Sequence, residues 1–228
     1  MENYATSKTD LIKNPAPRCA CVLLLDTSES MRGAPIDQLN AGLKVLLDEI
    51  SSHEKALESV EIAIVAFGAK VTPVVSFTSA DKVTVPLLVA AGPTPMVEAV
   101  KVGQMLLAER LNEYENAGIA RLRPLVILMT DGQPTDAQGM PTDDYKATAS
   151  LLRAASLRPH KDGAGIRVCC VAIGENARVD ILSEFCSPAE PPIRIDPNEF
   201  RKLFRWFSVY LADIVHSQDA EKLRTDDW

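Results

Sequence analysis

Two carboxylates and three hydroxyls occupy positions in this sequence from which their oxygen atoms could surround a metal ion. The segment Asp26-Thr27-Ser28-Glu29-Ser30 carries one carboxylate and two of the hydroxyls on alternating residues. Carboxylate and hydroxyl oxygens are hard donors, which suit Mg²⁺ or Mn²⁺. With the distant Thr94 and Asp131 added, the sequence predicts a metal site of Asp26, Ser28, Ser30, Thr94 and Asp131. Mg²⁺ is the expected ion, and Mn²⁺ or Ca²⁺ are the alternatives.

The elements that must position these residues alternate between strands and helices. Unbroken apolar runs indicate the strands, and apolar residues spaced three and four positions apart indicate the helices. We expect strands at 21–25, 60–67, 71–77, 125–129, 166–173 and 191–195, and helices at 35–50, 96–111, 142–152, 181–185 and 200–214. This order favours an α/β, doubly wound and mostly parallel central sheet of about six strands, flanked by helices. The short connection before 71–77 predicts that this strand is an antiparallel edge.

Asp26 and Asp131 both follow predicted strands directly. In open parallel sheets, ligands bind beyond the carboxyl ends of the strands. If the two strands lie side by side, both carboxylates reach one rim of the sheet, and that rim is where we expect the site.

Composition limits the classes of partner. The chain has 24 Lys and Arg against 31 Asp and Glu, a net charge of −7, which does not favour nucleic acid or an anionic membrane surface. No apolar run is long enough to span a bilayer. Residues 1–18 lack the pattern of a secretory signal, so we expect a cytoplasmic location. We expect the five cysteines to be reduced residues, most of them in strands of the core. The expected organisation is an N-terminal arm (1–18), one domain (19–217) and a C-terminal tail (218–228).

The predicted metal residues resemble a known site. The von Willebrand factor A (VWA) family, whose fold is Rossmann-like, has a metal-ion-dependent adhesion site that combines Asp-x-Ser-x-Ser, a distant Thr and a distant Asp. All five positions match here, and the resemblance runs over about 19–213. The strings at 26–33 (DTSESMRG) and 130–136 (TDGQPTD) are similar, more narrowly, to the bacterial tellurium-resistance-associated (TerY-like) branch.

The resemblance implies roles that the residues alone do not give. Ser28, Ser30 and Thr94 would bind the cation directly, while Asp26 and Asp131 would often act through water. A partner protein would complete the metal shell with an acidic side chain. The implied function is a protein-binding adaptor without catalysis, in a bacterial stress-resistance or phosphosignalling system such as tellurium resistance. A kinase-like or phosphatase-like protein is the expected partner.

Each site residue also has an ordinary structural interpretation. Asp26 and Asp131 could cap helices, Thr94 could be an N-cap, and the two serines could bond the loop backbone. We prefer the metal site because all five residues occur together in the expected order.

The sequence departs from the usual family pattern at two places. Glu29 stands between the two serines, where it could face solvent or could compete with a partner's carboxylate for the metal. Pro93 and Pro95 flank Thr94 and should stiffen its loop.

An enzyme is the alternative function. A Mg²⁺-dependent phosphohydrolase could use Asp26 and Asp131. Such enzymes usually place a second Asp two residues after the first, where this chain has Ser28, and Arg32 is the basic residue nearby in sequence.

Overall fold

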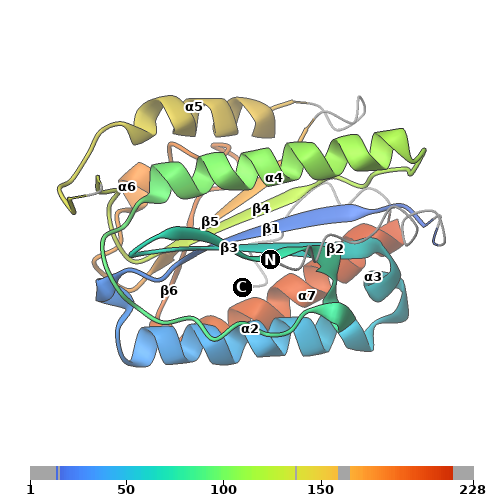
Figure 1. The fold of residues 1–228 in the computed structure, drawn as a ribbon, viewed down its shortest axis with the longest axis horizontal. Helices are drawn as coiled ribbons and strands as arrows, with labels where there is room; N and C mark the ends of the chain where they lie inside the picture. Colours follow the sequence, from blue (N-terminus) through green and yellow to red (C-terminus); the bar gives the residue numbers. More distant parts are fainter. Residues whose placement is uncertain (1–13, 15, 137, 159–164, 218–228) are drawn as a thin grey trace.

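Six strands form one central sheet, in the order β3-β2-β1-β4-β5-β6 (Figure 1). The computed structural model describes residues 14, 16–136, 138–158 and 165–217. The strands are β1 (Cys19–Asp26), β2 (Val60–Phe67), β3 (Val71–Ser79), β4 (Leu125–Thr130), β5 (Arg167–Ile173) and β6 (Ile193–Ile195). Neighbouring strands pair in parallel except β2 with β3. The predicted doubly wound sheet and its antiparallel edge strand are confirmed.

Helices cover both faces of the sheet (Figure 1). On one face lie α2 (Ala34–Ser52), α3 (Glu54–Ser59) and α7 (Phe200–Ser217), and on the other lie α4 (Met96–Asn116), α5 (Tyr145–Ser156) and α6 (Val179–Leu182). Short 3-10 turns are η1 (Glu29–Met31), η2 (Ala80–Lys82) and η4 (Pro197–Glu199). Each face therefore has its own apolar core against the sheet.

The predicted boundaries differ from the observed ones mainly in short elements. The helix α3 was not predicted, because six residues are too few to show a helical period. The helix expected at 181–185 is α6, which begins at Val179 and ends at Leu182. The strand expected at 191–195 begins only at Ile193, since two prolines precede it and lack the amide hydrogen that a ladder needs.

The strand β1 shows why an unbroken apolar run is a central strand. All eight of its residues are buried. Leu23 and Leu25 face the core under α2 and α7, whereas Val22 and Leu24 face the core under α4. Side chains of a strand alternate between the two faces of the sheet, but this alternation does not show in the sequence because both faces are covered and both need apolar residues. This strand carries Asp26 at its end.

The five cysteines are free and buried, as expected for reduced core residues. Burial alone raises the pKa of the Cys19 thiol to about 12, so this thiol stays protonated at neutral pH.

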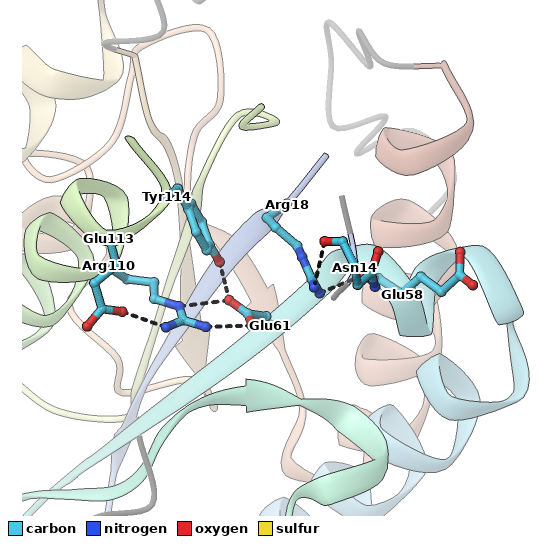
Figure 2. A network of polar contacts seen from close by, with 7 residues as sticks. All are labelled: Asn14, Arg18, Glu58, Glu61, Arg110, Glu113 and Tyr114. Carbon is cyan, nitrogen blue, oxygen red and sulfur yellow. Dashed lines mark hydrogen bonds and ion pairs between the residues drawn. The ribbon is translucent and has the colours of Figure 1, made fainter. Parts of the chain in front are cut away.

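A buried ion pair that the sequence analysis missed joins α4 to β2 (Figure 2). The Arg110 guanidinium donates from Nε to Glu61 Oε2 (2.8 Å) and from Nη2 to Glu61 Oε1 (2.6 Å). The Tyr114 hydroxyl also donates to Glu61, and Arg110 Nη1 reaches Glu113 Oε2 at 2.5 Å. These bonds fix the helix that follows the Thr94 loop against the start of β2.

Most of the expected N-terminal arm and all of the expected C-terminal tail (218–228) lie outside the described residues. Arg18, the last residue of that arm, is buried, and its Nη1 donates to Glu58 O at 2.6 Å (Figure 2). Its backbone amide donates to Ala120 O at 2.8 Å. None of the helices in the described ranges combines the length and apolarity needed to cross a bilayer.

Candidate metal centre

The candidate site lies where the winding of the sheet reverses direction. The strands β1 and β4 are neighbours at the centre, with Leu25 paired with Met129. The connection from β1 leads to β2 on one side, whereas β4 leads to β5 on the other. Chain segments leave this point in opposite directions, which opens a crevice at the carboxyl ends. Asp26 ends β1 and Asp131 follows the end of β4, so the prediction of a shared rim is confirmed.

The Asp26 carboxylate is buried and holds its own loop in place. Its Oδ1 accepts a hydrogen bond from the Ser28 backbone amide at 2.8 Å. Its Oδ2 accepts one from the Thr130 hydroxyl at 2.5 Å. Asp26 thus links the ends of β1 and β4 directly.

A row of hydrogen bonds continues from Ser28 to Asp131. The two serine hydroxyl oxygens lie 3.0 Å apart, and Ser30 Oγ donates to Asp131 Oδ1 at 2.8 Å. Asp26, Ser28, Ser30 and Asp131 are therefore brought together, although more than a hundred residues separate the two carboxylates along the chain.

The backbone of Thr94 is bonded to Thr135, on the loop that follows Asp131. Its amide donates to Thr135 Oγ1 at 2.8 Å, and its carbonyl accepts from the Thr135 amide at 3.0 Å. The Thr94 hydroxyl oxygen lies 3.6 Å from where a Cβ on Gly132 would be, beside the residue after Asp131. Among the described residues, no hydrogen bond joins the Thr94 hydroxyl to the side chains of the other four.

Close backbone packing holds the loops of the site together. The Thr27 carbonyl accepts from the Ala91 amide at 2.8 Å, and the Glu29 amide donates to Gly92 O at 2.9 Å. A Cβ on Gly68 would lie 2.4 Å from the Thr27 carbonyl oxygen and 2.7 Å from that of Ala91. Only glycine fits between these two loops.

Burial makes both carboxylates reluctant to ionise without a counter-charge. Burial raises the pKa of Asp26 to about 6, although the hydrogen bonds from Ser28 and Thr130 act in the opposite direction. Burial also raises the pKa of Asp131, against the bond from Ser30. A cation at this rim would favour the ionised form of both groups.

The residues present fit a hard divalent ion. Two carboxylates neutralise its charge, and three hydroxyls add oxygen donors without further charge. The rim holds no cysteine or histidine donor, and nowhere in the described ranges do three His, Cys, Asp or Glu side chains gather as a metal cluster. This is a donor set for Mg²⁺, Mn²⁺ or Ca²⁺ rather than for zinc.

The ordinary structural interpretations account poorly for the hydroxyl side chains of Ser28, Ser30 and Thr94. The N-cap residue of α4 is Pro95 rather than Thr94, and it makes no side-chain cap bond. Ser28 precedes η1 and makes no side-chain cap bond either. The hydroxyls of Ser28 and Ser30 contact each other and Asp131 instead of the loop backbone.

Glu29 adopts the solvent-facing of its two expected positions. It forms an exposed ion pair with Arg32, with Arg32 Nε at 2.6 Å from Glu29 Oε1 and Nη2 at 2.8 Å from Oε2. Arg32, the basic residue nearest the site in sequence, is therefore engaged by a neighbouring side chain.

The sequence analysis missed Thr130 and Thr135, which support the site. Thr130 donates to Asp26 and Thr135 bonds both backbone groups of Thr94. A signal for Thr130 was present, because it sits next to Asp131 at the end of a strand that had to lie beside β1. Thr135 carried no such signal.

A family model described as von Willebrand factor type A domain matches residues 21–203. The comparison with curated proteins finds no match.

Several solved structures share the fold. The pilus adhesin SpaC from Lactobacillus rhamnosus GG, in its open conformation, has a TM-score of 0.63 at 16% identity, over 89% of this chain and 30% of that one. Proximal thread matrix protein 1 from the mussel byssus has a TM-score of 0.54 at 18% identity, over 89% and 46%. Manganese-loaded TRAP protein from Plasmodium vivax has a TM-score of 0.52 at 22% identity, over 82% and 71%. The chain spans less than half of the length of the first two proteins. At these identities, the likeness shows the fold alone.

Proposed function

The chain belongs to the von Willebrand factor type A domain family, and from this premise we propose that it is a metal-dependent protein-binding module. The metal residues in this proposal are Asp26, Ser28, Ser30, Thr94 and Asp131. The observation that carries it is the hydrogen-bonded row from Asp26 through both serines to Asp131, at the carboxyl ends of adjacent strands.

In this proposal, Ser28, Ser30 and Thr94 bind the ion directly, and Asp26 and Asp131 act through water. Mg²⁺ held by these residues would offer an open position to an oxygen atom from outside the chain. Asp26 fixes the position of the loop through the Ser28 backbone amide, and Asp131 orients the Ser30 hydroxyl. A partner's Asp or Glu side chain fills the open position. A manganese-loaded protein and a pilus adhesin among the structural relatives support a binding role of this kind.

The finer proposal is an intracellular adaptor in a bacterial stress-resistance or phosphosignalling system, such as tellurium resistance. Its support is the similarity of 26–33 and 130–136 to the TerY-like branch. A kinase-like or phosphatase-like protein is the first partner to test. Five free buried thiols accord with a reducing, cytoplasmic location.

Affinity enrichment from native lysate tests the binding function. Wild type and the double variant Ser28→Ala/Asp131→Ala are each used with Mg²⁺ and with chelator. We expect at least one protein to be retained only by the wild type with Mg²⁺. Retention of the same proteins with and without metal, and by both wild type and variant, would contradict the proposal. Phosphatase assays would then be the next step.

The matched control is Ser52→Ala/Asp48→Ala, which removes the same atoms at exposed positions of α2 away from the rim. This variant should retain the same proteins as the wild type.

A further inference from the structure

An exposed aliphatic stripe lies on the segment that leads to the candidate metal centre. Between η2 and α4, the side chains alternate in burial: Leu88 and Ala90 are buried, while Leu87 is 82% and Val89 70% exposed. Val85 is also exposed. This alternation is typical of an extended chain with one face on the core. We call Val85, Leu87 and Val89 the aliphatic stripe.

One edge of this segment is held by α2. The Asn40 side chain donates to the Leu88 carbonyl and accepts from the Leu88 amide, both at 2.9 Å. The side-chain amide thus pairs with Leu88 as a neighbouring strand would. Pro86, two residues earlier, has no amide hydrogen, so its place on the same edge leaves no donor unsatisfied.

Within the part of the chain that the structure describes, nothing pairs with the opposite edge. In an extended chain, the backbone groups of successive residues point alternately to the two edges. Those of Val85, Leu87 and Val89 therefore point away from Asn40. No other residue in the described ranges makes a hydrogen bond to the backbone amides or carbonyls of these three.

The stripe runs directly into the loops of the metal centre. Ala91 and Gly92, just after the stripe, are bonded to Thr27 and Glu29. Thr94 lies five positions after Val89, which limits the distance between their Cα atoms to about 18 Å. A partner segment along the stripe can therefore continue to the rim within a few residues.

We propose that the partner docks on this stripe as an extended segment that adds a strand to its open edge. The partner's backbone pairs with Leu87 and Val89, and its aliphatic side chains at alternate positions cover the stripe. The end of the segment nearest the rim carries the Asp or Glu that reaches the metal. This last feature rests on the proposed function, whereas the backbone pairing does not.

An extended segment fits better than a helix because it can satisfy unpaired backbone groups at two-residue intervals. Backbone bonds supply affinity in such strand addition, and the alternate side chains supply specificity. Proteins usually protect an exposed apolar edge with charge or cover it. The stripe itself carries no charged side chain.

Selection from a displayed library of short random peptides, with the whole chain and Mg²⁺, provides the probe. We expect selected peptides with aliphatic residues at alternate positions and an acidic residue near one end. Failure to select any binding peptide would count against the proposal.

The selected peptide is then measured against surface variants. Leu87→Asp/Val89→Asp should weaken binding by at least about tenfold. The control Leu151→Asp, at an exposed leucine on α5, should change it less than about twofold. All variants should unfold at the same temperature, because the substituted side chains are exposed. Equal binding by the stripe variant and wild type would overturn the inference.

Amide hydrogen exchange distinguishes strand addition from simple apolar contact. In the free protein, the Leu88 amide should exchange slowly and those of Leu87 and Val89 quickly. The bound peptide should slow amide exchange at Leu87 and Val89. N-methylation of every second peptide residue should abolish binding for one of the two alternating sets of residues and leave it intact for the other. Unchanged exchange at Leu87 and Val89 would refute the pairing. Chelator and Asp131→Ala test the role of the metal separately. If both abolish peptide binding while Leu87→Asp/Val89→Asp leaves it unchanged, the proposed function is supported and this inference is rejected.

Discussion

At the residue scale, the structural role of Asp26 conflicts with the burial of its carboxylate in the metal-free protein. It orders the loop through Ser28 and joins β1 to β4 through Thr130, yet it does so fully buried. Burial raises its pKa from 3.8 to about 6, so the folded chain without metal holds a proton that the unfolded chain releases at lower pH. A cation bound at this site would favour the ionised form of Asp26, because its positive charge would replace the stabilisation that water gives to an exposed carboxylate.

This conflict predicts how stability depends on pH in chelator. Between pH 4 and pH 6 the folded state binds more protons than the unfolded state, so the free energy of unfolding falls as pH rises. The Asp26 contribution corresponds to roughly 3 kcal/mol. Asp26→Asn removes the titration, so urea unfolding of wild type and variant should diverge across this window. Parallel pH curves for the two proteins would show that Asp26 does not titrate as described.

Sequence reasoning found the residues of the site more readily than their supports. Asp26 and Asp131 were predictable because each follows an apolar run directly, and parallel strands end at a common edge. Thr135 was not, because its bonds to Thr94 depend on how a long loop returns to the rim. Contacts between loops are set by the packing of the whole sheet and leave no local pattern.

At the element scale, the position of α4 depends on charges inside the protein. Its buried Arg110 meets Glu61, the second residue of β2, with both side chains almost inaccessible to solvent. The sequence predicted the helix and the strand from their apolar residues alone. It could not predict the pairing, because these residues are far apart in the chain and either could have been on a solvated face.

Removing one partner should therefore be costly. Arg110→Ala leaves Glu61 buried without its counter-charge, and we expect the free energy of unfolding to fall by about 3–5 kcal/mol. The double variant Glu61→Leu/Arg110→Met should be more stable than the single variant, since no uncompensated charge remains. Chemical denaturation measures both. A double variant less stable than Arg110→Ala would show that the ion pair is not the cause.

The loop contacts make a second prediction at this scale. Gly68→Ala places a methyl group against the carbonyl oxygens of Thr27 and Ala91, and neither backbone can move without disturbing its neighbours. We expect a loss of about 1–3 kcal/mol in stability. Because Thr27 precedes Ser28, Mg²⁺ binding should weaken as well. Calorimetric titration and thermal unfolding check the two effects, and normal values of both would mean that the loops are not tightly packed there.

At the scale of the whole molecule, one sheet with a core on each face brings three segments that are far apart in the chain, which carry residues 26–30, Thr94 and Asp131, to a single rim. The alternation of strands and helices was readable because most strands are unbroken apolar runs and most helices have a clear apolar stripe. The reversal of winding between β1 and β4 then follows from the strand order. Short elements such as α3 escaped prediction because tertiary contacts, rather than local pattern, determine them.

The direct test of the account is the binding of Mg²⁺ to the purified chain, measured by calorimetry together with thermal unfolding. Wild type should bind one ion per chain and gain about 2.7 kcal/mol of stability at a hundred times the dissociation constant. The folded variant Ser28→Ala/Asp131→Ala should show neither binding nor stabilisation, and the control Ser52→Ala/Asp48→Ala should show both. Equal Mg²⁺ binding by the site variant, or none by the wild type, would contradict the proposed metal centre.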